Sequence, residues 1–214
     1  MKLLAFDSST HACTVALQVD HAIQSFHVIA PMQQTKLLLP KIEEILKSVN
    51  LQVRDLDAIV YGCGPGSFTG IRLAASVAQG LAFAADLPII PISSLAATAQ
   101  AAYIEHGWRN LLVAQDARMN AVYWGVYQIN QAGLAELQGT EHATAPEDVK
   151  IACKSDWQGL GDAWEKNGEK MGYTPQSIKS EQVPTAEALL QLGKLAFEQQ
   201  RWVSAKDALP LYLR

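Results

Sequence analysis

The residues best placed to do chemistry form a glycine-rich turn, Cys63-Gly64-Pro65-Gly66-Ser67-Phe68-Thr69-Gly70-Ile71-Arg72. An apolar run that ends at Tyr61 precedes this turn, and an uncharged, alanine-rich segment follows it. A strand, a turn and a helix start in this order direct backbone N–H groups outward, where they can bind an anion. The same glycines also allow tight packing against another segment. The turn therefore predicts either a phosphate site or a close strand-to-helix connection, and it matches neither the Walker A nor the GxGxxG motif.

Two further turns carry acidic and hydroxyl side chains at the ends of apolar runs. Asp7, Ser8 and Ser9 follow the run from Lys2 to Phe6, at the strand end where ligands bind in α/β proteins. Asp7 could hold Mg²⁺ there, or it could bond nearby backbone N–H groups within a turn. In the second half, Arg118 could bind a phosphate with two hydrogen bonds, or it could pair with Asp116.

Eight residues thus form the candidate phosphate-facing set. They are Asp7, Ser8, Ser9, Gly64, Gly66, Ser67, Asp116 and Arg118.

No catalytic or metal-binding residues are expected. The five histidines show no HxxxH spacing and none lies near a CxxC, which is unlike a zinc site. Ser67 has no recognisable histidine partner, so a serine hydrolase triad is not supported and a peptidase is disfavoured.

Composition narrows the class of protein. The chain has 214 residues, 49% of them hydrophobic and 18% charged, as in an ordinary globular protein. A net charge of −4 argues against nucleic-acid binding by the chain alone. Cys13, Cys63 and Cys153 are few and far apart, which predicts reduced thiols. Because no charge-free apolar run approaches the length of a membrane span, we expect a cytoplasmic protein with no membrane contact.

The order of predicted elements indicates the fold. In the first half we expect strands at 2–6, 13–19, 22–29, 56–61 and 89–90, and helices at 33–49, 69–85 and from 93 or 94 to 106. In the second half we expect strands at 111–115, 121–129, 134–139 and 157–160, a short helix from 146 and a long helix at 185–201. Both halves open with a strand, an Asp-containing turn and a strand, which predicts an actin/Hsp70/sugar-kinase-like α/β superfold. Its two related subdomains, each with a mixed sheet, would span residues 1–107 and 108–214.

The chain resembles the TsaB family, also called YeaZ, over its full length. The matching landmarks are Asp7-Ser8-Ser9, Leu38-Leu39-Pro40, Gly64 to Arg72, Ser93-Ser94-Leu95, Asp116-Ala117-Arg118 and Tyr212-Leu213-Arg214. Three positions depart from the family pattern. Gln34 replaces a common His, Ala121 replaces Glu or Gln, and Ala163 interrupts a Gly-x-Gly, which weakens any adenosine pocket within this chain.

The resemblance implies a non-catalytic scaffold subunit for threonylcarbamoyladenosine formation next to the tRNA anticodon. Its partners would be TsaD, as a heterodimer, and the ATPase TsaE, with a homodimer forming when TsaD is absent. Contact with tRNA would come mainly through the complex. No tightly bound cofactor is expected, and ATP or ADP would bind at the junction with partner subunits. Where TsaD has its metal-binding HxxxH, this chain has Ser94 and Thr98.

The helices at 33–49 and 69–85 would form the partner interface, since family members pair through them as a helical bundle. The uncharged stretch of the second helix also fits a centrally buried helix, and this interpretation stays open. The expected partner-binding residues are Leu38, Ile42, Ile45, Leu73, Ala74, Val77, Ala78 and Leu81. The alternative function is an ATPase or small-molecule kinase of the same superfold that acts alone through Asp7, Asp116 and the glycine-rich turn.

Overall fold

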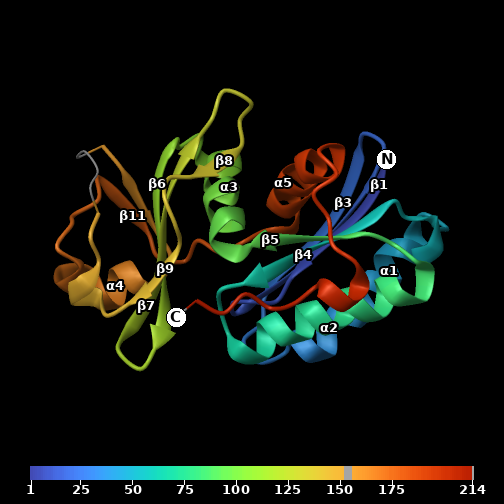
Figure 1. The fold of residues 1–214 in the computed structure, drawn as a ribbon, viewed down its shortest axis with the longest axis horizontal. Coiled ribbons are helices and arrows are strands. Elements are labelled where there is room, and N and C mark those ends of the chain that lie inside the picture. Colours follow the sequence, from blue (N-terminus) through green and yellow to red (C-terminus); the bar gives the residue numbers. More distant parts are fainter. Residues whose placement is uncertain (152–155, 214) are drawn as a thin grey trace. The chain divides into compact units, whose positions relative to one another are not determined.

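Two mixed β-sheets, each with its own helices, organise the chain (Figure 1). The computed structural model describes residues 1–151 and 156–213, so that Cys153 and Arg214 lie outside the described residues. The first unit comprises Met1–Ser94 and Pro184–Leu211, and the second comprises Leu95–Val183 and the residues from Tyr212. This division differs from the predicted boundary at residue 107 in two ways. The helix of residues 94–106 packs on the second sheet, and the last long helix returns to the first.

The first unit contains a five-stranded sheet. Its strands are β1 (Lys2–Asp7), β2 (Ala12–Val19), β3 (Ala22–Ile29), β4 (Ala58–Gly64) and β5 (Ile89–Ser93), in the spatial order β3-β2-β1-β4-β5. The strand β1 pairs antiparallel with β2 and parallel with β4. The helices are α1 (Gln34–Ser48), α2 (Phe68–Ala85) and α5 (Ala186–Glu198), with 3₁₀ turns η1 (Val53–Asp55) and η4 (Ala205–Asp207).

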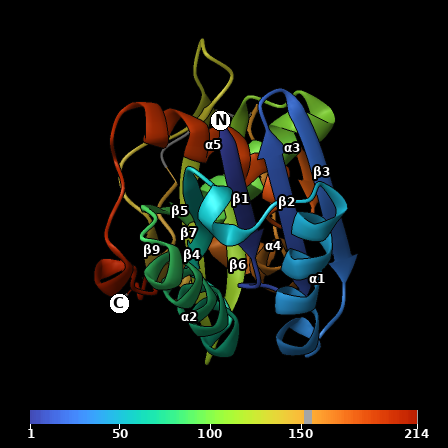
Figure 2. The same cartoon turned by 90° about the vertical axis from the view of Figure 1, so that its right-hand side faces the viewer.

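The helices of the first unit cover both faces of its sheet (Figures 1 and 2). Leu4 and Phe6 belong to the core cluster that includes α1 and α2. On the opposite face, the Thr14 hydroxyl accepts a hydrogen bond from the Ala186 N–H at 2.9 Å, and Gly193 of α5 lies against Val60. Because successive side chains of a strand point to opposite faces, the fully apolar strands are buried on both sides.

The second unit repeats this plan. Its strands are β6 (Asn110–Arg118), β7 (Ala121–Ile129), β8 (Ala135–Leu137), β9 (His142–Thr144), β10 (Gln158–Leu160) and β11 (Ser177–Lys179), and its helices are α3 (Ser94–His106) and α4 (Ala163–Asn167). The order is β11-β10-β6-β7-β8, and β9 also pairs with β7. Leu95 and Ala99 of α3 pack with one face of this sheet, and Trp164 of α4 packs on the other.

The two sheets share one topology. In each, the first strand lies between the second strand, which is antiparallel to it, and a later strand, which is parallel to it: β4 in the first unit and β10 in the second. This duplicated mixed sheet confirms the predicted actin/Hsp70/sugar-kinase-like fold. The predicted strand at 134–139 is shorter than expected. The elements β9, β11 and α4 were not predicted, because three to five residues carry no readable periodicity.

Candidate functional site

In the first unit, the glycine-rich turn packs directly against the residues that follow β1. The Ser67 N–H donates a hydrogen bond to the Ser9 carbonyl at 2.7 Å. The Ser8 hydroxyl donates to the Gly70 carbonyl at 2.9 Å. A Cβ added at Gly66 would lie 2.5 Å from the Ser9 carbonyl oxygen, and one added at Gly70 would lie 1.9 Å from that of Ser8. Close backbone approach therefore requires glycine at both positions.

The Asp7 side chain is buried beside this turn and is only 1% exposed. Its Oδ1 accepts hydrogen bonds from the N–H and the hydroxyl of Ser9, both at 2.7 Å, and its Oδ2 accepts one from the Ser94 hydroxyl at 2.8 Å. A Cβ added at Gly62 would lie 1.7 Å from Oδ2, so this glycine makes room for the carboxylate. Burial raises the pKa of Asp7 above its ordinary value of 3.8, while the hydrogen bonds from Ser9 and Ser94 act in the opposite direction.

Six of the predicted phosphate-facing residues therefore come together in the first unit, and the contacts described here link them to one another. They are Asp7, Ser8, Ser9, Gly64, Gly66 and Ser67. The N–H groups of Gly64 and Ser67 donate to protein oxygens, those of the Ser94 hydroxyl and the Ser9 carbonyl. These contacts match the close strand-to-helix connection, the second of the two interpretations that the turn allowed.

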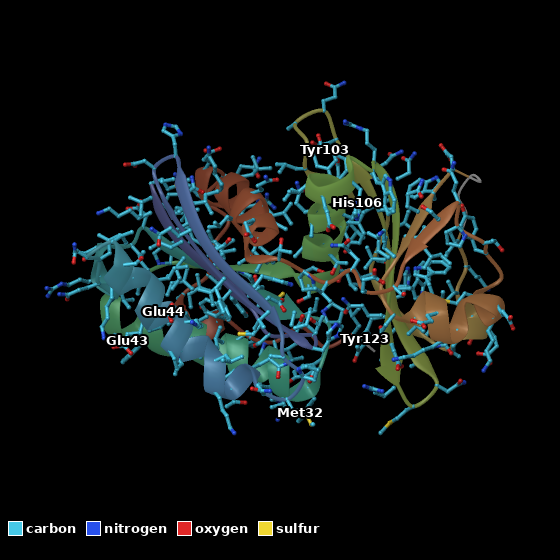
Figure 3. The ribbon with its side chains drawn as sticks, turned by 180° about the vertical axis from the view of Figure 1, so that it is seen from behind. Met32, Glu43, Glu44, Tyr103, His106 and Tyr123 are labelled. Atoms are coloured by element: carbon cyan, nitrogen blue, oxygen red, sulfur yellow. The ribbon has the colours of Figure 1, made fainter. Side chains whose placement is uncertain are left out.

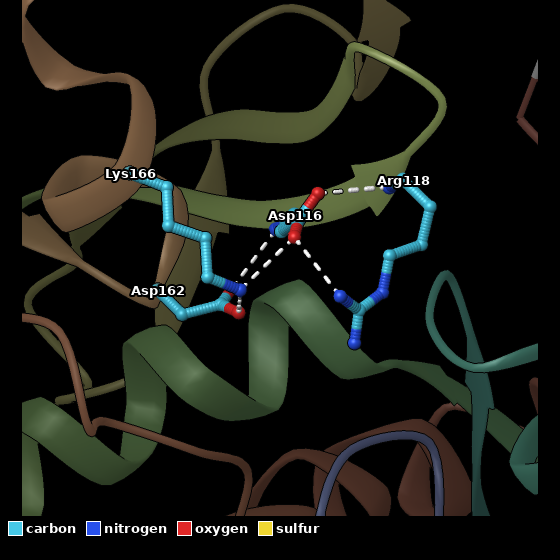
Figure 4. Close-up of polar contacts among 4 residues, drawn as sticks. All are labelled: Asp116, Arg118, Asp162 and Lys166. Carbon is cyan, nitrogen blue, oxygen red and sulfur yellow. Dashed lines mark hydrogen bonds and ion pairs between the residues drawn. The ribbon is translucent and has the colours of Figure 1, made fainter.

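In the second unit, Asp116 lies at the centre of an ion-pair cluster (Figure 4). Its Oδ2 is 2.9 Å from the Lys166 ammonium and 3.5 Å from the Arg118 guanidinium. Its Oδ1 accepts the Arg118 N–H at 2.9 Å, and its own N–H donates to Asp162 at 2.9 Å. Lys166 also pairs with Asp162 at 2.8 Å. Arg118 thus pairs with Asp116, as one of its two predicted roles requires, while 82% of its side chain stays exposed.

Sequence reasoning missed Asp162 and Lys166. The signal was an acid and a base four residues apart, a spacing that places two side chains on one face of a helix. Burial raises the pKa of Asp116, but the Lys166 hydrogen bond and the Arg118 N–H outweigh it and leave that pKa below 3.8. The hydrogen bonds to Asp162 and Asp116 raise the pKa of Lys166.

The hairpin that carries Arg118 has an unusual backbone. Arg118, Met119 and Asn120 all have positive φ, at 65°, 50° and 59°. Residues with a Cβ adopt this conformation at a cost, and three in succession mark a tightly turned tip. Met119 at this tip is fully exposed.

Ser94 and Thr98, the two hydroxyl residues that the resemblance aligns with metal ligands, are both fully buried. Ser94 donates to Asp7, and Thr98 accepts from the Gln115 amide at 3.5 Å. Among the described residues, no group of three or more His, Cys, Asp or Glu could hold a metal ion.

Two of the departures from the family pattern have structural roles here. The Gln34 amide donates to the Thr10 carbonyl at 2.7 Å and so ties the start of α1 to the loop after β1. Ala163 is fully buried in the second core. Gly161 beside it has φ of +96°, and a Cβ there would lie 2.3 Å from the Ala114 carbonyl oxygen.

Most of the expected partner-binding residues lie inside the first unit. Six of them are buried in the core of the first unit: Leu38, Ile42, Ile45, Ala74, Val77 and Ala78. The other two, Leu73 and Leu81, are half-buried at its edge. The regular apolar stripe of each helix faces the sheet, so these six side chains mainly hold the helices in place. Ile42 and the half-buried Leu81 also line the groove described below.

The outward face of α2 has a different composition. Its exposed residues Arg72, Ser76, Gly80 and Phe83 recur at helical spacing, and we name them the α2 stripe. Phe83 is 84% exposed, and no atom of the described residues lies within 4 Å of a Cβ added at Gly80.

A mainly apolar groove of about 630 Å³ lies between α1 and α2. Leu39, Leu46, Leu51, Leu81, Ala84 and Ala85 line it, and Glu43, Lys47 and Arg54 add charge. Glu43 lies on the outward side of α1 (Figure 3) and pairs with Lys47.

Among the described residues, α2 is the one helix long and apolar enough to cross a membrane by length and composition. Seven of its 18 residues are buried in the first unit, and a helix that packs on a sheet meets the same criteria.

Comparison with known proteins shows the family. The family model described as TsaD, tRNA N6-adenosine threonylcarbamoyltransferase, matches residues 28–186. The tRNA threonylcarbamoyladenosine biosynthesis protein TsaB of Escherichia coli is 36% identical over all of this chain and 95% of its own length. The protein of the same name from Haemophilus influenzae is 37% identical over all of this chain and 94% of its own.

A solved structure agrees with these relatives. The structure of YeaZ from Pseudomonas aeruginosa is 41% identical to this chain, with a TM-score of 0.95 over 99% of each chain. Full-length similarity in both sequence and structure shows that this chain belongs to the TsaB (YeaZ) family.

Proposed function

We propose that this chain is a non-catalytic subunit in the formation of threonylcarbamoyladenosine next to the tRNA anticodon, and that it docks on TsaD. Its named relatives are tRNA threonylcarbamoyladenosine biosynthesis proteins, and the family model that it matches is that of TsaD. One observation carries the docking role, the apolar groove between α1 and α2 beside the exposed α2 stripe.

The chemistry of this face suits a helix of a partner protein. The groove can take apolar side chains, and Gly80 lets a second helix approach the α2 backbone closely. Phe83 offers a large exposed aromatic anchor, a residue type enriched in interface cores. When TsaD is absent, a second copy of the chain would occupy the same face.

Two features support the non-catalytic part of the proposal. The Asp7 carboxylate is buried and bonded to Ser9 and Ser94. The Asp116 carboxylate is paired with Lys166 and Arg118. Both acids are thus engaged in holding their own turns, whereas an ATPase or kinase of this superfold would need them to face a metal-bound nucleotide.

The remaining components follow from the family. A net charge of −4 suits a chain that leaves most of the tRNA contact to its partners. TsaE would be recruited to the heterodimer, and ATP or ADP would bind at the junction between subunits.

Reconstitution with TsaD, TsaE, tRNA and threonylcarbamoyl-adenylate tests the proposal. We expect modification to depend strictly on this chain, and the chain alone to give no product. The variant Gly80→Arg should weaken TsaD binding by about tenfold or more, since a long charged side chain would stand between the helices. Unchanged TsaD affinity and unchanged modification with this variant would contradict the docking role.

Gly168→Arg is the matched control, since Gly168 is a second glycine with nothing within 4 Å of an added Cβ, and it lies in the second unit. It should bind TsaD as the unaltered chain does. Ala78→Arg is not a clean test, because Ala78 is fully buried and the substitution would disrupt the core.

Titration of the lone chain with ATP and Mg²⁺ separates the proposal from the alternative enzyme. Weak or undetectable binding is expected, because the N–H groups of Gly64 and Ser67 already donate to protein oxygens. Micromolar binding would instead favour an ATPase or kinase that acts alone.

A further inference from the structure

A single hydroxyl group joins three elements of the first unit. The Ser94 hydroxyl donates to Asp7 Oδ2 at 2.8 Å and accepts the Gly64 N–H at 3.2 Å. Asp7 ends β1, Gly64 ends β4, and Ser94 follows β5 as the first residue of α3. Ser94 is also the residue at which the first unit ends and the chain passes into the second.

The carboxylate that receives this hydroxyl is held from its other side too. Asp7 Oδ1 accepts the N–H and the hydroxyl of Ser9. The charge of Asp7 acts on the Cys13 thiol of β2, whose pKa is raised to about 11 by burial and then by Asp7. Asp7 is therefore an acceptor of three hydrogen bonds in a closed site, and it makes no described ion pair.

The contacts continue from this point into α2. Ser67, the residue before α2, donates its N–H to the Ser9 carbonyl, and Ser8 donates to the Gly70 carbonyl within the first turn of the helix. Because Gly70 allows no Cβ against Ser8, the start of α2 has little freedom to move relative to this segment.

We propose that Asp7 and Ser94 form a buried latch that holds the glycine-rich turn closed and thereby fixes the start of α2. Asp7 acts here as a positioning residue. The latch connects the point where the chain leaves the first unit to the helix that carries the docking face. Its effect on TsaD binding rests on the function proposed above, whereas its effect on the turn does not.

The thiol of Cys63 reports the state of the turn in the full-length chain. Cys63 precedes Gly64 and is buried, with 8% exposure. Labelling with a small thiol reagent under native conditions, followed by peptide mass spectrometry, gives the rate at this cysteine. We expect Ser94→Ala to raise the rate by about tenfold, since one buried hydrogen-bonding group is removed. Asp7→Asn should have a similar effect, because its amide nitrogen cannot accept the Ser94 hydroxyl.

Thr98→Val is the matched control. It removes another fully buried hydroxyl one turn later in α3, and the partner of that hydroxyl, Gln115, is in the second unit. The labelling rate at Cys63 should stay unchanged in Thr98→Val, even if this substitution lowers the free energy of unfolding. Ser94→Thr keeps the hydroxyl and should label slowly.

Equal labelling rates in the unaltered chain, Ser94→Ala and Asp7→Asn would overturn the latch. So would equal acceleration by Thr98→Val, which would indicate a general loss of stability. Failure of the docking proposal would appear separately, as unchanged TsaD binding by Gly80→Arg, and would leave the labelling result intact.

Discussion

At the scale of single residues, two glycines of α2 differ in what surrounds them. Gly70 faces the Ser8 carbonyl oxygen, which would lie 1.9 Å from an added Cβ. A Cβ added at Gly80 would have no atom within 4 Å in the part of the chain that the structure describes. Glycine is unfavourable inside a helix unless close packing requires it. Gly70 is therefore required by the fold, and Gly80 is free of that constraint.

The variants Gly70→Ala and Gly80→Ala should accordingly have opposite effects. Gly70→Ala should lower the free energy of unfolding by about 3 kcal/mol or more, because backbone must shift to admit the methyl group. Gly80→Ala should raise it by about 0.5–1 kcal/mol through helix propensity. Urea unfolding of both variants measures the difference, and a Gly70→Ala variant as stable as the unaltered chain would show that the turn is not closely packed.

The pairing of Asp116 with Lys166 predicts a pH dependence of stability. Because the pKa of Asp116 is lowered in the folded state, its stabilising effect is present above its ordinary value of 3.8 and is lost as the pH falls through the lowered value. Asp116→Asn should lower the free energy of unfolding by at most about 1 kcal/mol at pH 7, since Lys166 is half exposed. The loss should become smaller as the solution is made acidic. Denaturant unfolding at pH 7 and at a pH below 3.8 measures this difference. Lys166→Met should lower the free energy of unfolding at pH 7 by at least as much, because it also removes the pairing with Asp162. A cost that grows in acid would contradict this assignment.

At the scale of elements, α2 has two faces of different composition. Ala74, Val77 and Ala78 pack on the sheet, while Gly80 and Phe83 point to solvent beside the groove. An exposed aromatic on such a face should drive association of the lone chain at high concentration.

Phe83→Asp should therefore shift the lone chain toward monomer. The side chain is 84% exposed, so the free energy of unfolding should change by less than about 0.5 kcal/mol. Sedimentation equilibrium measures the association. Met119→Asp is the control, since it also replaces an exposed apolar side chain by aspartate, but in the second unit. If Phe83→Asp and Met119→Asp both associate as strongly as the unaltered chain, the prediction is wrong.

The sequence predicted these helices well and their surfaces poorly. The spacing of Leu38, Ile42 and Ile45 identified α1, but the same regularity marks the stripe that faces the protein's own core. The α2 stripe contains a cation, small residues and one aromatic residue, so the hydrophobic periodicity of the sequence does not identify it. In the turns, the types of Asp7 and Asp116 were informative, but their partners Ser94 and Lys166 lie far away in sequence and only the folded chain brings them near.

At the scale of the whole molecule, the first unit is discontinuous in sequence. Val203 exchanges two backbone hydrogen bonds with Ile89 of β5, and the Leu209 carbonyl accepts the Tyr61 hydroxyl at 2.9 Å. Strands before residue 94 thus depend on residues after 184 for one of their covered faces and for part of their edge. The predicted boundary at 107 missed this because α5 reads as an ordinary amphipathic helix, with no sign of which sheet it covers.

A fragment of residues 1–107 should therefore not fold by itself, since the face of the sheet that carries Val60 would be exposed to water. A chain in which a Gly/Ser linker joins residue 94 to residue 184 should fold, because it restores α5 and the strap from Val203 to Leu211. Circular dichroism during urea unfolding distinguishes the two: the joined chain should show a cooperative transition and the fragment none. A cooperative transition in the fragment would mean that residues 1–107 are stable without α5 and the strap. The boundary at residue 107 would then describe the folding unit better than the contacts do.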